Sequence, residues 1–237
     1  AVQPNKQTLF SLFPDHYILY KPKEILSGDF YWGRKVQNKE EKDISIFSLA
    51  DCTGHGVPGA LMSLIGNNLL NNAVLNKKLT HPSDILNHIQ NEFYTKMFKE
   101  DAEGTVKDGM DIAILAYDPG LNTLRFAGAK LSLIIFRNGE YEEIKGDKKS
   151  VGIGRYNKQD DKGFKGYEIK VQKEDTAFLF TDGFIDQFGG ENDQRFMKKN
   201  FLELLKKVNS LSFNIQRSHL LKTLNQWQGN KSQNDDI

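Results

Sequence analysis

The sequence predicts an α+β fold in one domain. Runs of strand length follow one another without regular alternation with helices, and four amphipathic helical segments form two pairs, one between early strands and one near the end. A doubly wound parallel sheet would alternate strand and helix. No linker divides the 237 residues. We therefore expect a single domain over residues 16–237, preceded by a lead-in segment of residues 1–15.

The composition excludes several function classes. Lysine and arginine number 32 and acidic residues 31, so no overall field favours nucleic acid or an anionic membrane. No apolar run reaches membrane-spanning length. Cys52 is the one cysteine, so an intrachain disulfide is impossible, which suits a reducing cytosol. The first residue is not methionine, which suits a module of a longer protein.

The first two predicted strands each carry an aspartate near one end. An aromatic strand over residues 25–33 contains Asp29, and after a polar turn a second strand begins at residue 43 and leads to Asp51. A glycine-rich turn follows, and Pro58 opens a helix. The register is not derivable from the sequence, but an antiparallel pair allows both carboxylates to share a metal site.

The remaining helices and strands are predicted from the spacing of apolar residues and from the turn residues between them. Helical spacing of apolar residues predicts helices over 58–74 and 82–97. Strands, a hairpin at Asn138-Gly139 and two terminal helices come next, and the predicted ranges are 110–117, 123–127, 133–136, 141–144, 167–171, 175–181, 196–208 and 215–227. Residues 99–107 and 145–166 are predicted loops. The mostly apolar run 175–181 suits a central strand, and it ends at Asp182-Gly183.

Acidic residues stand out by their context: Asp29, Asp51, Asp182 and the pair Asp235-Asp236. Each alone is typical of a turn or cap. Together they favour a metal site, because converging carboxylates repel one another unless divalent cations neutralise them. Oxygen ligands select Mg²⁺ or Mn²⁺ over zinc. Two such ions can share a water that attacks phosphorus, which implies hydrolysis of a phosphate ester.

Cys52 and His55 allow other interpretations. No second cysteine or histidine pair completes a zinc site. A phosphatase with a cysteine nucleophile should carry an arginine shortly after the cysteine, and residues 53–61 contain none. Cys52 is then a small buried residue whose backbone carbonyl matters. His55 is either a turn residue or an acid or phosphate contact.

At this point the chain resembles the PPM-type (protein phosphatase 2C) serine/threonine phosphatases, in their bacterial SpoIIE and RsbU-like branch. The resemblance runs from His16 to Ile237, and six motifs in the family's order carry it. They are Ser27-Gly28-Asp29-Phe30-Tyr31-Trp32, the Asp51 to Gly59 stretch, Asp108-Gly109-Met110-Asp111, Phe126-Ala127-Gly128-Ala129, Thr181-Asp182-Gly183-Phe184-Ile185-Asp186 and Asp235-Asp236-Ile237.

The resemblance implies a β-sandwich of two antiparallel sheets flanked by helix pairs (αββα), with two Mn²⁺ or Mg²⁺ ions. Asp51 corresponds to the carboxylate that bridges the metals, and the Cys52 carbonyl to a glycine carbonyl ligand. Asp29 resembles a ligand on one side, and Asp182 and Asp235 resemble ligands on the other. Asp51 and Asp182 are the catalytic candidates. Asp111 lies beside the site, and Gly128-Ala129 lacks the aspartate that would hold a third ion.

The resemblance also implies a partner. In this branch the substrate is a phosphoserine or phosphothreonine on a small regulatory protein, often an anti-sigma factor antagonist. The phosphatase is commonly the C-terminal output domain of a sensor, and a homodimer is compatible with that role. We therefore expect a cytoplasmic location, either free or as the cytoplasmic part of a membrane-bound sensor, with no insertion of this segment into the membrane.

Two other functions stay open at this stage. One is a phosphatase-fold module without activity that serves as a binding or scaffold element in signalling. The retained carboxylates argue against it, because a scaffold has no reason to collect charges that repel one another. The other is hydrolysis of a small phosphate ester, for which a preference for free small substrates would be the sign.

Overall fold

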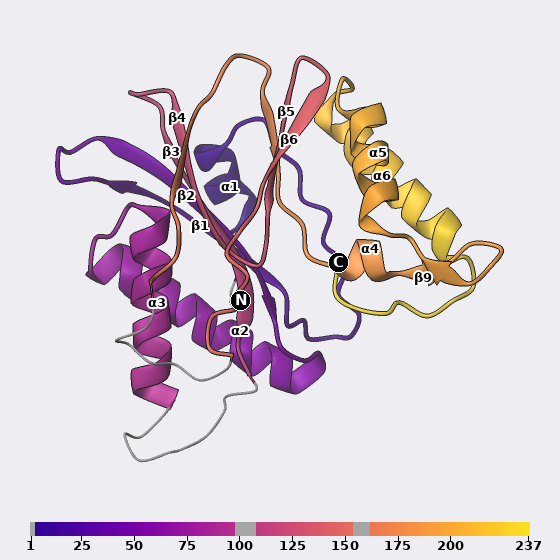
Figure 1. Ribbon diagram of the computed structural model, residues 1–237, viewed down its shortest axis with the longest axis horizontal. Helices are drawn as coiled ribbons and strands as arrows, with labels where there is room; N and C mark the ends of the chain where they lie inside the picture. Colours follow the sequence, from indigo (N-terminus) through magenta and orange to yellow (C-terminus); the bar gives the residue numbers. More distant parts are fainter. Residues whose placement is uncertain (1–2, 98–107, 154–161) are drawn as a thin grey trace.

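A computed structural model of the protein describes residues 3–97, 108–153 and 162–237. Helices and sheets form four layers, because α2 (Gly56–Asn71) and α3 (Pro82–Met97) cover the outer face of one sheet and α5 (Lys198–Val208) and α6 (Phe213–Gln228) cover the outer face of the other (Figure 1). This arrangement confirms the predicted α+β sandwich. In the described ranges, no helix is long and apolar enough to cross a membrane.

The predicted elements from residue 43 onward appear in the predicted order, and the structure adds two short helices and a short hairpin that were not predicted. The helices are α1 (Lys6–Leu12), α2 (Gly56–Asn71) with a π-helical extension (Asn72–Asn76), α3 (Pro82–Met97), α4 (Gly183–Asp186), α5 (Lys198–Val208) and α6 (Phe213–Gln228). The strands are β1 (Phe30–Gln37), β2 (Asp43–Cys52), β3 (Met110–Asp118), β4 (Thr123–Ala129), β5 (Leu133–Arg137), β6 (Glu140–Ile144), β7 (Tyr167–Lys170), β8 (Thr176–Phe178), β9 (Phe188–Gly189) and β10 (Gln194–Arg195).

Both main sheets are antiparallel throughout. The first has the strand order β1-β2-β3-β4-β7 and the second β6-β5-β8, while β9 and β10 form a small separate hairpin. Short turns connect β1 to β2 and β3 to β4, as antiparallel neighbours allow. Consequently the start of β1, the end of β2 and the start of β3, where the aspartates lie, are side by side at one end of the first sheet.

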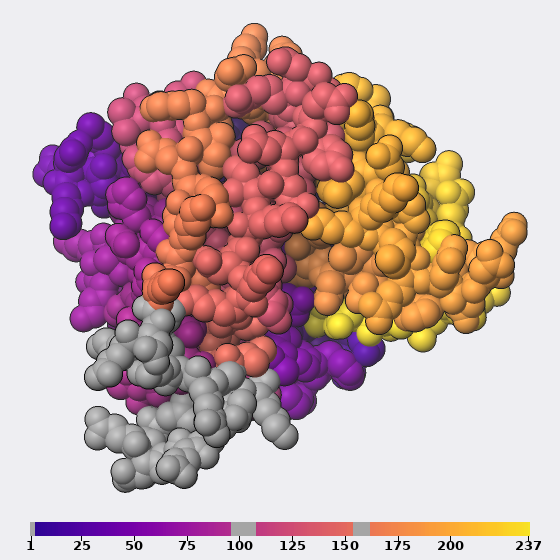
Figure 2. All heavy atoms as spheres, viewed as in Figure 1, coloured from indigo at the N-terminus to yellow at the C-terminus, as the bar shows by residue number. Residues whose placement is uncertain are grey.

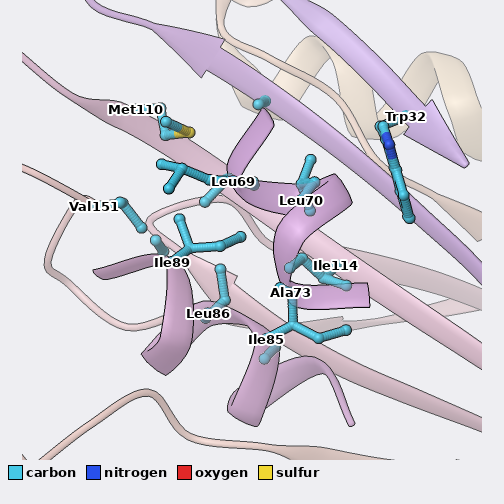
Figure 3. Packing of buried hydrophobic residues seen from close by; sticks show 14 of the residues in the cluster. Trp32, Leu69, Leu70, Ala73, Ile85, Leu86, Ile89, Met110, Ile114 and Val151 are labelled. Atoms are coloured by element: carbon cyan, nitrogen blue, oxygen red, sulfur yellow. The ribbon is translucent and has the colours of Figure 1, made fainter. Parts of the chain in front are cut away.

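Successive side chains of the strands point to opposite faces of the sheets, and the buried residues form three hydrophobic clusters. In β3, Ile112 and Ile114 face α2 and α3, while Ala113 and Leu115 face the second sheet. Because successive side chains point to opposite faces, a strand that is covered on both sides must be apolar at nearly every position. Figure 3 shows the first core, where residues of α2 and α3 converge on β3.

The core beneath α5 and α6 is rich in aromatic rings. Phe184 lies with its ring centroid 4.8 Å from that of Phe201 and 5.1 Å from that of Phe196. Phe136 of β5 and Leu224 of α6 are fully buried in the same cluster. In the space-filling view these C-terminal helices form the right side of the molecule, next to β5 and β6 (Figure 2).

The lead-in segment contains a helix that packs on the first sheet. Leu9 and Leu12 of α1 are buried, and the Ser45 hydroxyl donates to the Leu12 carbonyl at 3.2 Å. A Cβ atom at Gly33 would lie 2.5 Å from the Leu12 side chain, so the glycine makes room for the helix. The domain boundary at residue 15 remains a prediction.

Several strand limits differ from the predicted ones. β1 begins at Phe30 and continues to Gln37, so Asp29 precedes the strand and the turn is shorter. β8 covers only Thr176–Phe178 and lies at an edge of its sheet, so the prediction of a central strand over 175–181 was wrong. Asp175, which directly precedes β8, pairs with Arg137 at the end of β5 at 2.6 Å.

The two predicted loops are described only in part. The loop at 99–107 lies outside the described residues. In the other, bridges join Val151 to Met110 and Asp147 to Ala129, so its described portion runs beside the ends of β3 and β4.

Candidate functional site

Strand register brings the first two candidate aspartates face to face. Phe30 pairs with Ala50 across β1 and β2, so Asp29, one residue earlier, lies opposite Asp51, one residue later. Directly opposed side chains share a face, with Cβ atoms about 4.5–5.5 Å apart. On the other side of β2, Asp51 pairs with Asp111 of β3. The first sheet therefore aligns three carboxylates across three neighbouring strands.

Glycines let the two aspartate-bearing segments touch. A Cβ atom at Gly28 would lie 2.5 Å from the Gly54 carbonyl oxygen, and one at Gly59 would lie 2.3 Å from the same atom. Neither position has a positive φ, so the requirement is close approach and not backbone conformation. The Cys52 carbonyl oxygen is 3.2 Å from the position of a Gly28 Cβ, so it faces the segment that leads to Asp29.

Asp182 reaches the same place from the second sheet. The Thr181 hydroxyl hydrogen-bonds the Asp29 carboxylate, which joins the segment after β8 to the end of β1. Gly183 begins α4, and a Cβ atom there would collide with the Asp236 carbonyl oxygen. The segment that carries Asp182 is therefore packed against both Asp29 and the C-terminal residues, whose position beside α4 is visible in Figure 1.

The two adjacent aspartates at the C-terminus have different environments. The Asp236 side chain is buried, and its two carboxylate oxygens accept the backbone N–H groups of Lys23 and Gly28, each at 2.8 Å. Asp235 is exposed, and one of its oxygens accepts the N–H group of Asp236 at 2.9 Å. Asp236 thus anchors the segment before Asp29, while Asp235 is the carboxylate with capacity left for a ligand.

Backbone pairing supports this end of the chain. Lys21 and Ile237 exchange two N–H to carbonyl hydrogen bonds, and the Gln233 side chain donates to the Lys21 carbonyl at 2.6 Å. The residues around Asp235 are therefore tied to the segment that precedes β1. An unanchored terminus would have lost more conformational freedom on binding a ligand.

Electrostatics show that the carboxylates repel one another. Burial and then the charge of Asp51 raise the pKa of Asp29 far above its usual range. Burial, followed by the charges of Asp182, Asp235 and Asp111, likewise raises the pKa of Asp51. The pKa of Asp182 is raised to about 6, first by burial and then by Asp235. The charge of Arg195 lowers the pKa of Asp182 only in part, so further positive charge is needed for all the carboxylates to ionise at neutral pH.

The candidate ligand side chains are not yet close enough together to bind a metal ion. Among the residues of the described ranges, no three acidic, cysteine or histidine side chains are arranged closely enough to hold a metal ion. The donor types nevertheless suit such an ion, because burial, followed by neighbouring carboxylate charges, raises the pKa values of Asp29, Asp51 and Asp182, and a bound cation would offset both effects.

Asp111 has partners that the sequence did not predict. Its carboxylate accepts the Ser150 hydroxyl at 2.5 Å on one oxygen and lies 3.7 Å from the Lys130 ammonium on the other. Ser150 is buried and belongs to the loop beside β3. Neither Ser150 nor Lys130 belongs to a recognised sequence motif. Their place beside Asp111 is seen only from the packing of that loop against the ends of β3 and β4.

Cys52 and His55 take structural positions. The Cys52 side chain is buried, and burial followed by the neighbouring aspartate charges raises the pKa of its thiol, so it stays protonated and is a poor nucleophile. His55 precedes α2, and its Nδ1 atom lies 2.6 Å from a Glu24 carboxylate oxygen. This pair links the start of α2 to the segment before β1 at the protein surface.

The raised pKa values predict that divalent metal stabilises the protein more as the pH rises. A carboxylate whose pKa is raised by folding contributes stability below its unfolded pKa, about 4, and loses it as the pH passes its folded pKa, about 6 for Asp182. Metal binding requires the ionised form. The increase in melting temperature on adding Mg²⁺ or Mn²⁺ to chelator-treated protein should therefore grow between about pH 5 and pH 8. An increase that is equal at both ends of this range, or larger in acid, would contradict the coupling.

Comparison of the sequence with protein families gives one match. The profile of the SpoIIE family, described as stage II sporulation protein E, matches residues 42–237. No curated protein sequence matches the chain.

Solved structures with the same fold were also found. The SiaA-PP2C domain of Pseudomonas aeruginosa is 30% identical, with a TM-score of 0.83 over 100% of this chain and 88% of that one. The PP2C phosphatase domain of SpoIIE from Bacillus subtilis, with a fragment of its regulatory domain, is 13% identical, with a TM-score of 0.67 over 92% and 58%. The structure of the RsbU and RsbW domains of Rv1364c from Mycobacterium tuberculosis is 17% identical, with a TM-score of 0.63 over 90% of this chain and 54% of that one. At identities this low, the second and third matches establish the fold alone.

Proposed function

This chain belongs to the SpoIIE family of PP2C-type phosphatase domains, and we propose that it is a metal-dependent protein serine/threonine phosphatase. The observation that carries the proposal is the register that sets Asp29 opposite Asp51, next to the segments of Asp182 and Asp235. Burial and neighbouring charges, that of Asp235 among them, raise the pKa values of Asp29, Asp51 and Asp182, so these carboxylates require cations if all are to ionise.

We assign the proposed metal ligands from this geometry. Asp51 lies centrally, because the charges of both Asp182 and Asp235 act on it and it opposes Asp29. It is therefore the residue suited to contact two ions. As the family resemblance implies, we propose that Asp29 and the Cys52 carbonyl would serve one ion, and that Asp182 and Asp235 would serve the other. Asp236 is not among the ligands, since backbone N–H groups occupy both its oxygens.

The bound ions and the surrounding residues would have different roles in the reaction. When bound, a pair of Mg²⁺ or Mn²⁺ ions would activate the attacking water and offset the charge that develops on the phosphate. The protein itself orients the carboxylates: Thr181 holds Asp29, Asp236 holds the Gly28 segment, and the close contact between Gly28 and Gly54 fixes the distance between the two strand ends. We expect both Asp51 and Asp182 to be essential for activity.

The proposed substrate is a phosphorylated serine or threonine on a regulatory protein, such as an anti-sigma factor antagonist. Support comes from similarity to proteins of this type, among them the chain with both RsbU and RsbW domains. We propose a cytoplasmic location and an upstream sensor domain, consistent with the regulatory domain present beside the SpoIIE phosphatase domain. A homodimer is compatible with such a sensor.

The alternative is an inactive phosphatase fold that binds a partner. The retained acidic cluster disfavours it, because carboxylates that repel one another lower the stability of a metal-free protein and bring a scaffold no benefit. An inactive module would bind a phosphoprotein without hydrolysing it.

Metal removal tests the proposed activity directly. We expect hydrolysis of an aryl phosphate with Mn²⁺ or Mg²⁺, no hydrolysis with a chelator, and recovery when metal is returned, because the carboxylates cannot act on phosphate without cations. A phosphoserine peptide should be hydrolysed under the same conditions. The Asp182→Asn variant, measured beside the wild type, should be inactive at every metal concentration.

Other outcomes discriminate among the alternatives. Undiminished hydrolysis in the chelator or in the Asp182→Asn variant would refute the metal site. Efficient hydrolysis of small esters with none of phosphopeptides would favour a small-molecule phosphatase. Binding of a phosphopeptide with no turnover at high Mn²⁺ would favour the scaffold.

A further inference from the structure

The row of charged residues across the first sheet continues beyond the carboxylates to a cation. Ile112 pairs with Ala129 across β3 and β4, so Lys130, the next residue, lies opposite Asp111. Asp111 in turn lies opposite Asp51. Residues directly opposed across antiparallel strands share a face. Lys130 directly follows β4, and its ammonium lies 3.7 Å from the Asp111 carboxylate, so it extends the row Asp29, Asp51, Asp111 at the same end of the sheet.

The backbone of Lys130 is held in a fixed position. Its φ of 60° lies in the left-handed region, which a lysine seldom adopts. Its N–H group donates to the Asp147 carbonyl at 2.7 Å, and the Asp147 N–H group donates to the Gly128 carbonyl at 2.7 Å. The loop around Asp147 thus fixes where the lysine side chain begins, and the tight turn after β4 directs it toward Asp111.

The ammonium group keeps hydrogen-bonding capacity for a ligand. Its Nζ atom is 3.7 Å from the Asp111 carboxylate, an ion pair that is longer than a hydrogen bond. Within the described ranges, no hydrogen bond fixes this ammonium, and 48% of the side chain is exposed. Ser150 occupies the other Asp111 oxygen, so Asp111 stays in place beside the lysine.

A second cation near the cluster is already engaged. Arg195 contacts Asp186 at 3.0 Å and its guanidinium lies over the Phe188 ring at 5.7 Å from the centroid. It approaches the cluster from the side of Asp182, where its charge lowers the pKa of that carboxylate. Lys130 is therefore the better candidate to bind an incoming anion.

We infer that Lys130 binds the phosphate group of the substrate at the Asp111 end of the row, with Asp111 and Ser150 as the residues that position its ammonium. The inference rests on the proposed function, for which it supplies a contact between protein and phosphate. A phosphomonoester that approaches an acidic edge needs a cation from the protein as well as any bound metal. A lysine ammonium suits phosphate as a compact point charge.

Variants at Lys130 test this role with a matched control. Lys35 is the control, because it is also 48% exposed and pairs with Asp43, away from the candidate site on the same sheet. We would compare wild type, Lys130→Met, Lys130→Arg and Lys35→Met for KM and kcat on an aryl phosphate. We would also measure calorimetrically the affinity of the Mn²⁺-loaded proteins for inorganic phosphate, which needs no turnover.

Lys130→Met should weaken phosphate binding and raise KM by about 10- to 100-fold, as expected for the loss of a charged hydrogen bond. Lys130→Arg should restore most of the phosphate affinity and bring KM close to the wild-type value. Lys35→Met should match the wild type in both quantities. Mn²⁺ affinity should not fall in Lys130→Met, because that residue is not a ligand and its removal takes away a positive charge.

Two results would overturn the inference. One is wild-type phosphate affinity and KM in Lys130→Met. The other is a loss of Mn²⁺ affinity or thermal stability that accounts for the whole change and that Lys130→Arg does not restore. If the wild type hydrolyses no phosphate ester, the proposed function fails on its own, and the calorimetric comparison still decides whether Lys130 binds phosphate.

Discussion

Replacement of Asp51 by asparagine should abolish phosphatase activity and make the metal-free protein more stable. Asp51 lies opposite Asp29 and within the electrostatic reach of three further aspartates, so its loss removes the centre of the acidic cluster. Activity should fall by about 10³-fold or more, since metal catalysis supplies several kcal/mol of transition-state stabilisation. Without metal, removal of one repelling carboxylate should raise the free energy of unfolding by on the order of 1–3 kcal/mol at neutral pH.

The measurement pairs kinetics with unfolding in a chelator. Asp43→Asn is the matched control, because it makes the same change in the first residue of the same strand, where Asp43 is exposed and pairs with Lys35. It should leave activity unchanged. Activity that survives in Asp51→Asn would remove this residue from the site. A metal-free variant less stable than the wild type would show that Asp51 is primarily structural.

The adjacent residues Asp235 and Asp236 should respond in opposite ways to the same substitution. Asp236→Asn should lower the free energy of unfolding by about 2 kcal/mol or more, because two backbone N–H groups lose charged acceptors and one of them meets an amide NH₂ group instead. This loss outweighs the relief of one through-space repulsion with Asp29. Asp235→Asn should keep or increase metal-free stability and lose activity.

Urea unfolding in a chelator and metal-dependent hydrolysis measure the two effects separately. Activity in Asp236→Asn should be reduced because the Gly28 segment that leads to Asp29 loses its anchor. Unchanged stability in Asp236→Asn would contradict the proposed anchoring role. Full activity in Asp235→Asn together with loss of metal affinity in Asp236→Asn would exchange the assignments of the two residues.

Local patterns were sufficient for the class of fold. Helical periodicity located α2, α3, α5 and α6, and Asn138-Gly139 located the β5–β6 hairpin. These signals survive because a helix that covers a sheet must be apolar on one stripe, and a two-residue hairpin turn requires residues that accept positive φ, as both Asn138 and Gly139 do here.

Patterns were less reliable where tertiary contacts end a strand. The apolar run 175–181 gave no sign that β8 would stop at Phe178. Phe180 instead packs at 4.8 Å from Phe201, measured between ring centroids. An aromatic residue is equally apolar whether it continues a strand or fills a core beside a helix, so hydrophobicity alone does not locate the end of the strand.

By itself, the sequence determined which residues were candidates for the site. Asp29, Asp51, Asp182 and Asp235-Asp236 each stand in a motif with glycine or a strand end, and a carboxylate in such a place calls for a partner wherever the chain takes it. The chemistry of oxygen ligands and divalent ions follows from the residue types. Their arrangement does not, because a shift of one residue in strand pairing would turn a side chain to the opposite face.

Only the tertiary structure decided how these residues divide their roles. The register put Asp29, Asp51, Asp111 and Lys130 in one row, and burial separated Asp236, saturated by backbone N–H groups, from its exposed neighbour Asp235. Ser150 entered the site from a loop with no motif. The physical reason is that a carboxylate's role depends on the donors and charges around it, and folding brings these together from segments far apart in the chain, as with Lys23 and Asp236, which are 213 residues apart.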